Sequence, residues 1–232
     1  MELLPNGYTL ALCPGAFPLS TDSMALADFV RCRPHDRVLD LGSGCGALGL
    51  LLCAGNPGCT VTGIELDAAA HAMAEENIRR NGLYARLESI CADLTAIPTF
   101  LGSSSFDVCV SNPPYFSAGP ASKTHPTARQ ERSCTLAQVF AAAAWGLRWG
   151  GDFYLVHRPE RLGALCAQAD RAGFAPKRLR LLRHREDGPV TLVLLQCRKG
   201  AKQGLVWEEA ALFDRQGEKT ADYRRIYHQT NC

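Results

Sequence analysis

The chain has 232 residues, of which 47% are hydrophobic and 21% charged, the balance of an ordinary globular domain and not of a fibrous or disordered protein. No apolar run approaches the roughly 18 residues of a membrane helix, and the first residues lack a signal-peptide pattern. The sequence therefore predicts a cytoplasmic protein that does not associate with a membrane. The formal net charge is +2, but residues 1–120 hold 6 Lys and Arg against 12 Asp and Glu, whereas residues 121–232 hold 19 against 11. A basic C-terminal half is compatible with a polyanionic partner such as nucleic acid.

Short β-rich runs alternate with longer helical segments through most of the chain. The predicted strands, in chain order, cover residues 37–41, 60–66, 85–92, 106–111 and 152–157. The helices predicted between and after them cover residues 46–54, 67–81, 136–149 and 159–172. This alternation is typical of a parallel sheet with crossover helices, so the predicted fold class is α/β.

The pattern changes after Gly173. Residues 177–183 and 190–198 are two strand-like runs separated by Glu186-Asp187-Gly188-Pro189, a turn sequence too short for a helix, and they predict an antiparallel hairpin. No repeat or low-complexity linker divides the chain. We therefore expect a single domain over 1–232, with an N-terminal lead-in at 1–30 and an appended C-terminal strand and helix at 203–232.

The eleven cysteines predict neither a disulfide framework nor a metal site. Their number is odd, and no two of them are spaced as C-x-x-C. The six histidines do not pair at metal-binding spacing either. The sequence therefore predicts a protein without a bound metal, in which most cysteines are small buried apolar residues.

A glycine-rich loop follows the first predicted strand of the sheet. Gly42, Gly44 and Gly46 alternate between an apolar strand and an apolar helix, a pattern that lets the backbone approach a ligand and directs a helix N-terminus at it. The same residues, with Ala47, also fit the dinucleotide fingerprint G-x-G-x-x-G/A, with Glu65 as its ribose-binding acid. The loop alone leaves the identity of the ligand open.

Three acidic residues stand at the carboxyl ends of successive predicted strands. Asp40 precedes the glycine loop, Glu65 ends the second strand and Asp93 follows the third. Ligands of open α/β sheets bind at this edge. There Glu65 could accept hydrogen bonds from two ribose hydroxyls and Asp93 from an adenine amino group, while Asp40 would order the loop.

The sequence Asn112-Pro113-Pro114-Tyr115 follows the fourth predicted strand. The prolines restrict the backbone, so the Asn112 side-chain oxygen and the Pro113 carbonyl would point in fixed directions and accept hydrogen bonds from one amino group. This grip would align the lone pair of a planar amine with a methyl donor. Tyr115 offers a ring face for an extruded base, and Phe116 would form a wall of the pocket.

With this motif the chain resembles the class I S-adenosylmethionine-dependent methyltransferases that act on planar nitrogens. The resemblance covers nearly the whole chain and implies a Rossmann-like seven-stranded sheet, mostly parallel with an antiparallel last strand. It implies S-adenosyl-L-methionine as the cofactor. The cofactor-binding residues that it implies are Asp40, Gly42, Gly44, Gly46, Glu65, Leu66, Asp93, Leu94 and Asn112. The catalytic residues that it implies are Asn112, Pro113, Pro114 and Tyr115.

Three further segments, 17–27, 112–131 and 220–227, look like the bacterial tRNA adenine-N6 methyltransferases, which modify the adenine next to the anticodon of a valine tRNA. This resemblance implies N6-methylation of adenine in RNA, most specifically tRNA near the anticodon, by direct in-line displacement. The substrate-binding residues that it implies are Tyr115, Phe116, Lys123, Arg129 and Arg132.

Three alternatives stay open at this point. A protein glutamine N5-methyltransferase would use the same acceptor geometry, because a side-chain amide is also a planar NH₂ group. A nicotinamide-dependent oxidoreductase would use the same glycine loop, although the Asn-Pro-Pro-Tyr motif and the closing hairpin disfavour it. A non-catalytic RNA-binding module on a methyltransferase scaffold is the third alternative. The sequence leaves the oligomeric state undetermined.

Overall fold

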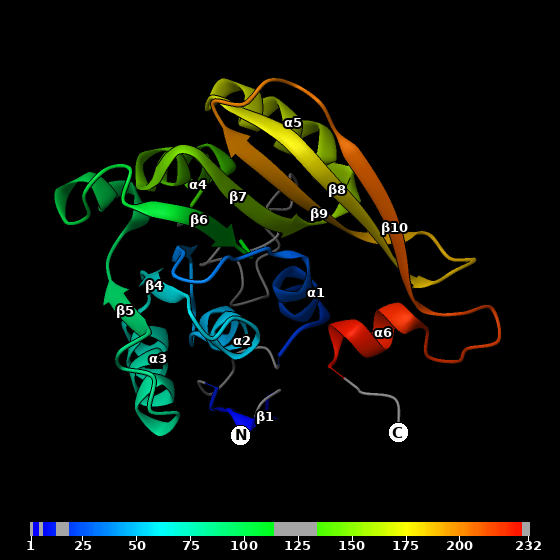
Figure 1. Ribbon diagram of the computed structural model, residues 1–232, viewed down its shortest axis with the longest axis horizontal. Helices are drawn as coiled ribbons and strands as arrows, with labels where there is room; N and C mark the ends of the chain where they lie inside the picture. The colour runs from blue at the N-terminus through cyan, green and yellow to red at the C-terminus, as the bar shows by residue number, and fades with distance from the viewer. Residues whose placement is uncertain (1, 5–6, 13–18, 114–133, 229–232) are drawn as a thin grey trace, which may run out of the picture.

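The computed structural model describes residues 2–4, 7–12, 19–113 and 134–228. Its main sheet has eight strands (Figure 1). They are β3 (Arg37–Leu41), β4 (Thr60–Glu65), β5 (Leu87–Cys91), β6 (Phe106–Ser111), β7 (Leu147–His157), β8 (Phe174–Arg185), β9 (Val190–Lys199) and β10 (Val206–Phe213). Their order across the sheet is β10-β8-β9-β7-β6-β3-β4-β5. A separate two-stranded sheet pairs β1 (Glu2–Leu3) with β2 (Thr9–Leu10).

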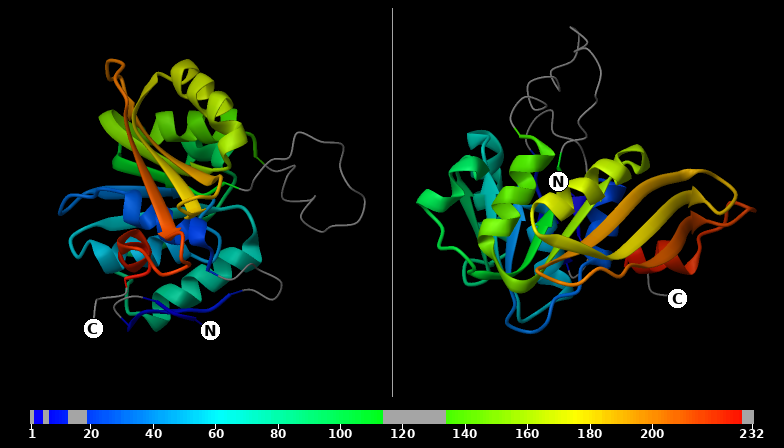
Figure 2. Two further views of the ribbon diagram at one scale, coloured as in Figure 1. Left: turned by 90° about the vertical axis from the view of Figure 1, so that its right-hand side faces the viewer. Right: turned by 90° about the horizontal axis from the view of Figure 1, so that it is seen from above.

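Helices cover both faces of the main sheet. One layer holds α1 (Thr21–Phe29), α2 (Ala47–Gly55), α3 (Ala68–Arg80) and α6 (Ala221–Ile226). The other holds α4 (Leu136–Gly146), α5 (Leu162–Arg171) and the 3₁₀ turn η2 (Leu94–Thr99); a second 3₁₀ turn, η4 (Pro159–Arg161), leads into α5. Figure 2 shows the sheet between the two layers. None of the described helices is long and apolar enough to cross a bilayer.

The core divides into two clusters because strand side chains alternate between the faces. Val38 and Val108 pack on the α1–α2 side, whereas Leu39 and Cys109 pack on the α4 side, and all four are buried. Both faces of these central strands are apolar, which is why β3 and β6 read as nearly continuous apolar runs and why the sequence predicts their bounds correctly.

The mostly parallel α/β fold is confirmed, but the expected number of strands is wrong. The predicted hairpin is β8–β9, and β9 runs antiparallel to both β7 and β8. The appended strand β10 then pairs parallel with β8, with Val206 opposite Arg178, and makes an eighth strand. The prediction of seven strands is wrong because β10 pairs with β8, the outer strand of the hairpin. No local sequence pattern indicates such pairing between distant segments.

The end of α4 differs from the prediction as well. The helix stops at Gly146 and not at residue 149, and β7 begins at once with Leu147. Leu147 pairs with Phe106 of β6 and is fully buried. Tertiary pairing therefore overrides the helical composition of this segment.

The chain order creates one switch point in the sheet. From β3 the chain passes outward to β4 and β5, and then returns to β6 on the other side of β3. In open α/β sheets, ligands bind at the carboxyl ends of the strands beside such a switch point, which here are the ends of β3 and β6.

Candidate active site

The switch point brings together the residues that follow β3, β4 and β6. Asp40 pairs with Gly63 of β4 on one side and with Val110 of β6 on the other, so Glu65 and Asn112 each lie two residues beyond a partner of Asp40. The strand ends are also tied directly, because the Ser111 hydroxyl donates to the Leu41 carbonyl at 2.8 Å.

The glycine loop has a backbone that only glycine adopts readily. Gly42, Gly44 and Gly46 have φ angles of +75°, +55° and +80°. A Cβ atom added to Gly42 or Gly44 would meet nothing within 4 Å, so the loop borders open space. The amides of Gly42 and Ser43 donate to the Ile64 carbonyl at 2.9 and 3.0 Å, which anchors the start of the loop on β4. The loop is therefore a fixed, open cradle at the N-terminus of α2.

Glu65 holds the loop from the neighbouring strand. Its Oε2 accepts from the Gly44 amide at 2.7 Å, and its Oε1 accepts from the Asp67 amide at 2.8 Å. Each carboxylate oxygen retains a second lone pair, so the side chain can still accept from two hydroxyls of a ligand. Leu66 beside it is 51% exposed, and a large apolar side chain with that exposure offers a surface for a planar ring.

Asp40 and Ser43 carry buried polar atoms that lack partners. Asp40 is 2% exposed, and neither its Oδ2 nor the Ser43 Oγ makes a hydrogen bond within the described part of the chain. Burial, with a smaller effect of the Glu65 charge, raises the pKa of Asp40 to about 7. Buried polar groups are nearly always satisfied, so these two atoms fit a ligand that brings hydrogen-bond donors or positive charge to the loop.

Asp93 lies at the same edge but is already engaged. Its Oδ1 accepts from the Thr95 amide at 2.8 Å and from the Thr95 hydroxyl at 2.7 Å, which caps η2. Leu94 is half-buried and packs on the α4-side core. An adenine contact would therefore use the remaining acceptor capacity of Asp93.

Asn112 is oriented by a residue that lies 89 positions earlier in the sequence. Its Nδ2 donates to the Ser23 hydroxyl of α1 at 3.1 Å, and its Oδ1 makes no hydrogen bond among the described residues. Ser20, the N-cap of α1, accepts from the Ser23 amide at 3.3 Å and fixes the first turn of the helix. Pro113 is buried. The Asn112 amide oxygen could therefore accept a hydrogen bond from a ligand.

Sequence reasoning assigned no role to Ser23. A serine in the first turn of a helix is a common capping residue, so its type and place carry no specific signal. The contact with Asn112, 89 positions later in the chain, exists only in the folded structure.

Comparison with known proteins shows to which family the chain belongs. The sequence profile described as "Methyltransferase small domain" matches residues 18–164, which span the glycine loop, all three acids and the Asn-Pro-Pro-Tyr motif. The chain belongs to this methyltransferase family. The resemblance to S-adenosylmethionine-dependent methyltransferases is thereby confirmed, and the oxidoreductase alternative loses its support.

Two relatives of this methyltransferase carry the same name, tRNA1(Val) (adenine(37)-N6)-methyltransferase. The protein of Edwardsiella ictaluri is 32% identical over 203 residues, which cover 84% of this chain and 81% of that one. The protein of Dyadobacter fermentans is 24% identical and covers 87% and 85%. Among solved structures, a predicted O-methyltransferase of Agrobacterium tumefaciens superposes with a TM-score of 0.75 at 21% identity. The superposition covers 89% of this chain and 95% of that chain, and at this identity it supports only the similarity of the fold.

Part of the predicted site lies outside the described residues of the methyltransferase. Those predicted catalytic and substrate-binding residues are Pro114, Tyr115, Phe116, Lys123, Arg129 and Arg132. Within the ranges that are described, no group of three or more His, Cys, Asp or Glu side chains could hold a metal ion.

Arg180 of β8 has neither of the two roles that the sequence suggests for it, a solvated residue or an RNA contact. Alternation along the strand predicts Arg178 and Arg180 on a solvated or RNA-binding face. Arg180 is instead 6% exposed and forms ion pairs with Asp28 of α1 and Glu208 of β10. These pairs join the appended strand to the first helix, so Arg180 is a structural residue.

Proposed function

We propose that this methyltransferase transfers the methyl group of S-adenosylmethionine to the N6 amino group of an adenine in tRNA. The observation that supports the proposal is the hydrogen bond from the Asn112 amide nitrogen to the Ser23 hydroxyl, which leaves the amide oxygen as an acceptor for the target amine. The names of the relatives supply the finer expectation of adenine 37 in a valine tRNA.

The residues at the switch point fit the proposed cofactor. S-adenosylmethionine would supply a methyl group on a positively charged sulfur. Asp40 and Ser43 would receive the ammonium group of its methionine part, Glu65 its ribose hydroxyls, and Leu66 one face of its adenine. An ammonium group beside Asp40 would lower the raised pKa of that carboxyl and so keep it ionised.

The proposed roles of Asn112 and Pro113 follow from the chemistry of an aromatic amine. The lone pair of an exocyclic amine is delocalised into the ring, so the free base is a poor nucleophile. Hydrogen bonds from its two hydrogens to Asn112 Oδ1 and to the Pro113 carbonyl would favour a tetrahedral nitrogen with an available lone pair. A methylated amine is cationic and loses its proton easily, so the proposal needs no strong base.

The test is to incubate the protein with methyl-labelled S-adenosylmethionine and bulk tRNA from cells that lack the gene. Mass spectrometry of the digested tRNA should show N6-methyladenosine, and the Asn112→Ala variant should not form it. Label in a protein fraction and none in tRNA would contradict the proposal and assign the site to glutamine N5-methylation.

A further inference from the structure

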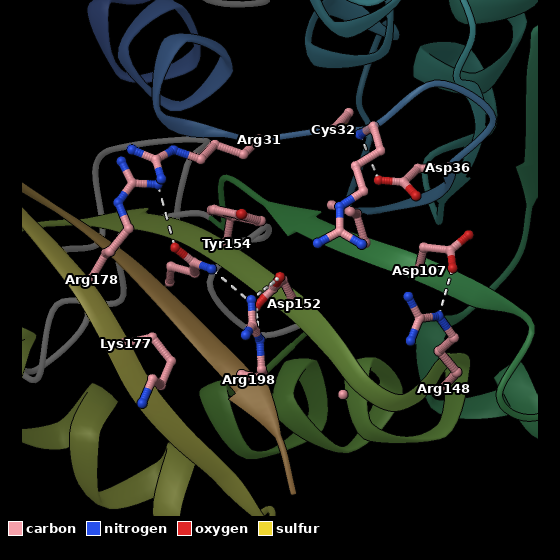
Figure 3. A pocket seen from close by; sticks show the side chains of 14 residues that line it. Arg31, Cys32, Asp36, Asp107, Arg148, Asp152, Tyr154, Lys177, Arg178 and Arg198 are labelled. Atoms are coloured by element: carbon pink, nitrogen blue, oxygen red, sulfur yellow. Dashed lines mark hydrogen bonds and ion pairs between the residues drawn. The ribbon is translucent and has the colours of Figure 1, made fainter. Parts of the chain in front are cut away.

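A cavity of about 450 Å³ lies at the opposite edge of the sheet from the candidate active site (Figure 3). Its walls come from the segment after α1 and from strands β6, β7, β8 and β9. Six of the lining side chains are basic: Arg31, Arg33, Arg148, Lys177, Arg178 and Arg198. We call this cavity the Arg31 pocket.

Two of these cations are neutralised by acids within the pocket. Arg148 donates from Nε to Asp107 at 2.6 Å, and Arg198 forms two hydrogen bonds of 2.9 Å with Asp152. Asp152 also accepts from Gln196. These carboxylates are therefore occupied and do not offset the remaining positive charge.

Of the other four cations, Arg178 forms an ion pair with Glu208 outside the lining at 3.3 Å, and the lining adds one further carboxylate, that of Asp36. Asp36 accepts from the backbone amide of Arg33 at 2.7 Å. Arg31 and Arg33 are exposed residues, and neither forms an ion pair with a described residue. The pocket thus keeps an excess of positive charge at its mouth.

Arg178 is held inside the pocket close to Arg31. Its guanidinium lies 4.4 Å from the centre of the Phe29 ring and donates to Gln196 at 3.3 Å, while its acidic partner Glu208 is 41% exposed. Burial, and then the positive charge of Arg31, lower the pKa of Arg178. Figure 3 shows the two guanidinium groups side by side. Two cations kept together at a concave surface favour binding of an anion.

Guanidinium groups match the geometry of phosphate oxygens, because their N–H donors lie in one plane and can bind two oxygens at once. We propose that the Arg31 pocket binds a phosphate group, supplied either by the RNA backbone or by a free phosphate compound. The pocket is separate from the methyl-transfer site, because Asp107 at its wall and Asn112 stand at opposite ends of β6, about 16 Å apart. The RNA source rests on the proposed function, whereas the free-phosphate source does not.

The test compares two double variants of the full chain. Arg31→Gln with Arg33→Gln removes two exposed pocket cations, and Arg171→Gln with Arg215→Gln removes the same charge from exposed positions outside the pocket. Fluorescence anisotropy with a labelled hairpin RNA at several salt concentrations and calorimetry with inorganic pyrophosphate measure binding. We expect the pocket variant to lose affinity for at least one probe by about tenfold, and the control variant to lose much less.

The two probes distinguish the sources of the phosphate. If the pocket variant loses affinity only for RNA, and its slope of log affinity against log salt falls by about one to two, the bound phosphate belongs to the RNA backbone. Loss of pyrophosphate binding assigns a free phosphate compound. Wild-type affinity of the pocket variant for both probes, equal losses in the two variants, or no binding of either probe by the wild-type protein would overturn the proposal. Binding needs no methyl transfer, so an inactive enzyme leaves this test intact.

Discussion

The two edges of the central parallel strands carry polar residues of opposite kinds. At the carboxyl edge, the Asp40 carboxylate and the Ser43 hydroxyl are buried and lack described partners. At the other edge, Asp107 and Asp152 are paired, and the surplus groups are exposed arginines such as Arg31. A buried unpaired acceptor suits a small ligand that makes direct contacts, whereas exposed cations attract a polyanion over a longer range. The predictions below test whether each edge has the function that its residues indicate.

The largest expected effect is a loss of turnover on substitution of Asn112, the residue proposed to hold the methyl acceptor. Asn112→Ala should lower turnover by about a hundredfold or more, because the target amine loses one of its two positioning hydrogen bonds. Affinity for S-adenosylhomocysteine, measured by calorimetry, should stay nearly unchanged. A comparable loss of both quantities would contradict the division between cofactor and acceptor residues.

Asp40→Asn should affect stability and cofactor binding in opposite directions. An ordinary Asp carboxyl has a pKa of 3.8, but that of Asp40 is raised to about 7, so the folded state holds this proton more tightly than the unfolded chain does. Binding of this proton stabilises the folded state fully below the unfolded-state pKa of 3.8, and this stabilisation is lost as the pH rises toward 7. The variant should therefore be more stable at pH 8, by at most roughly 4 kcal/mol.

Urea unfolding at pH 4.5 and pH 8 measures this change, and calorimetry measures cofactor affinity. We expect the variant to bind S-adenosylmethionine at least about tenfold more weakly, since a neutral amide pairs poorly with an ammonium group. A variant that keeps the wild-type pH dependence of stability would show that Asp40 is not the titrating group.

Ser23→Ala should produce a smaller loss of turnover, about three- to tenfold, because it removes one hydrogen bond that orients the Asn112 amide. The effect should fall on kcat and leave cofactor affinity unchanged. Ser23→Thr keeps the hydroxyl and should restore most of the rate. Equal losses in the alanine and threonine variants would indicate a packing role for Ser23.

The smallest expected effect is on the stability of the glycine loop. Gly42 has a φ of +75°, so Gly42→Ala should lower the free energy of unfolding by about 1 kcal/mol through backbone strain alone, since the added Cβ meets open space. Gly55→Ala in α2 is the matched control, because its Cβ is also free of contacts and its φ is not positive. That variant should be slightly stabilised in the same urea titration.

The amino-acid sequence by itself determined the features that depend on neighbours in the chain. The apolar runs of β3 and β6, the β8–β9 hairpin and the glycine loop after β3 were all predictable, because strand alternation, turn residues and left-handed glycine positions are local properties. The placement of acids at the carboxyl ends of the strands followed from the same local pattern. These features were enough to predict the fold class, and the Asn-Pro-Pro-Tyr motif carried the resemblance to the family.

The tertiary structure alone decided what those residues contact. It paired β10 with β8, placed Ser23 against Asn112 across 89 positions of the sequence, and buried Arg180 between Asp28 and Glu208. It also buried Asp40, which is why the pKa of that carboxyl is raised. The physical reason is the same in each case: burial and pairing between distant segments depend on how the whole chain packs, and no short stretch of sequence encodes them.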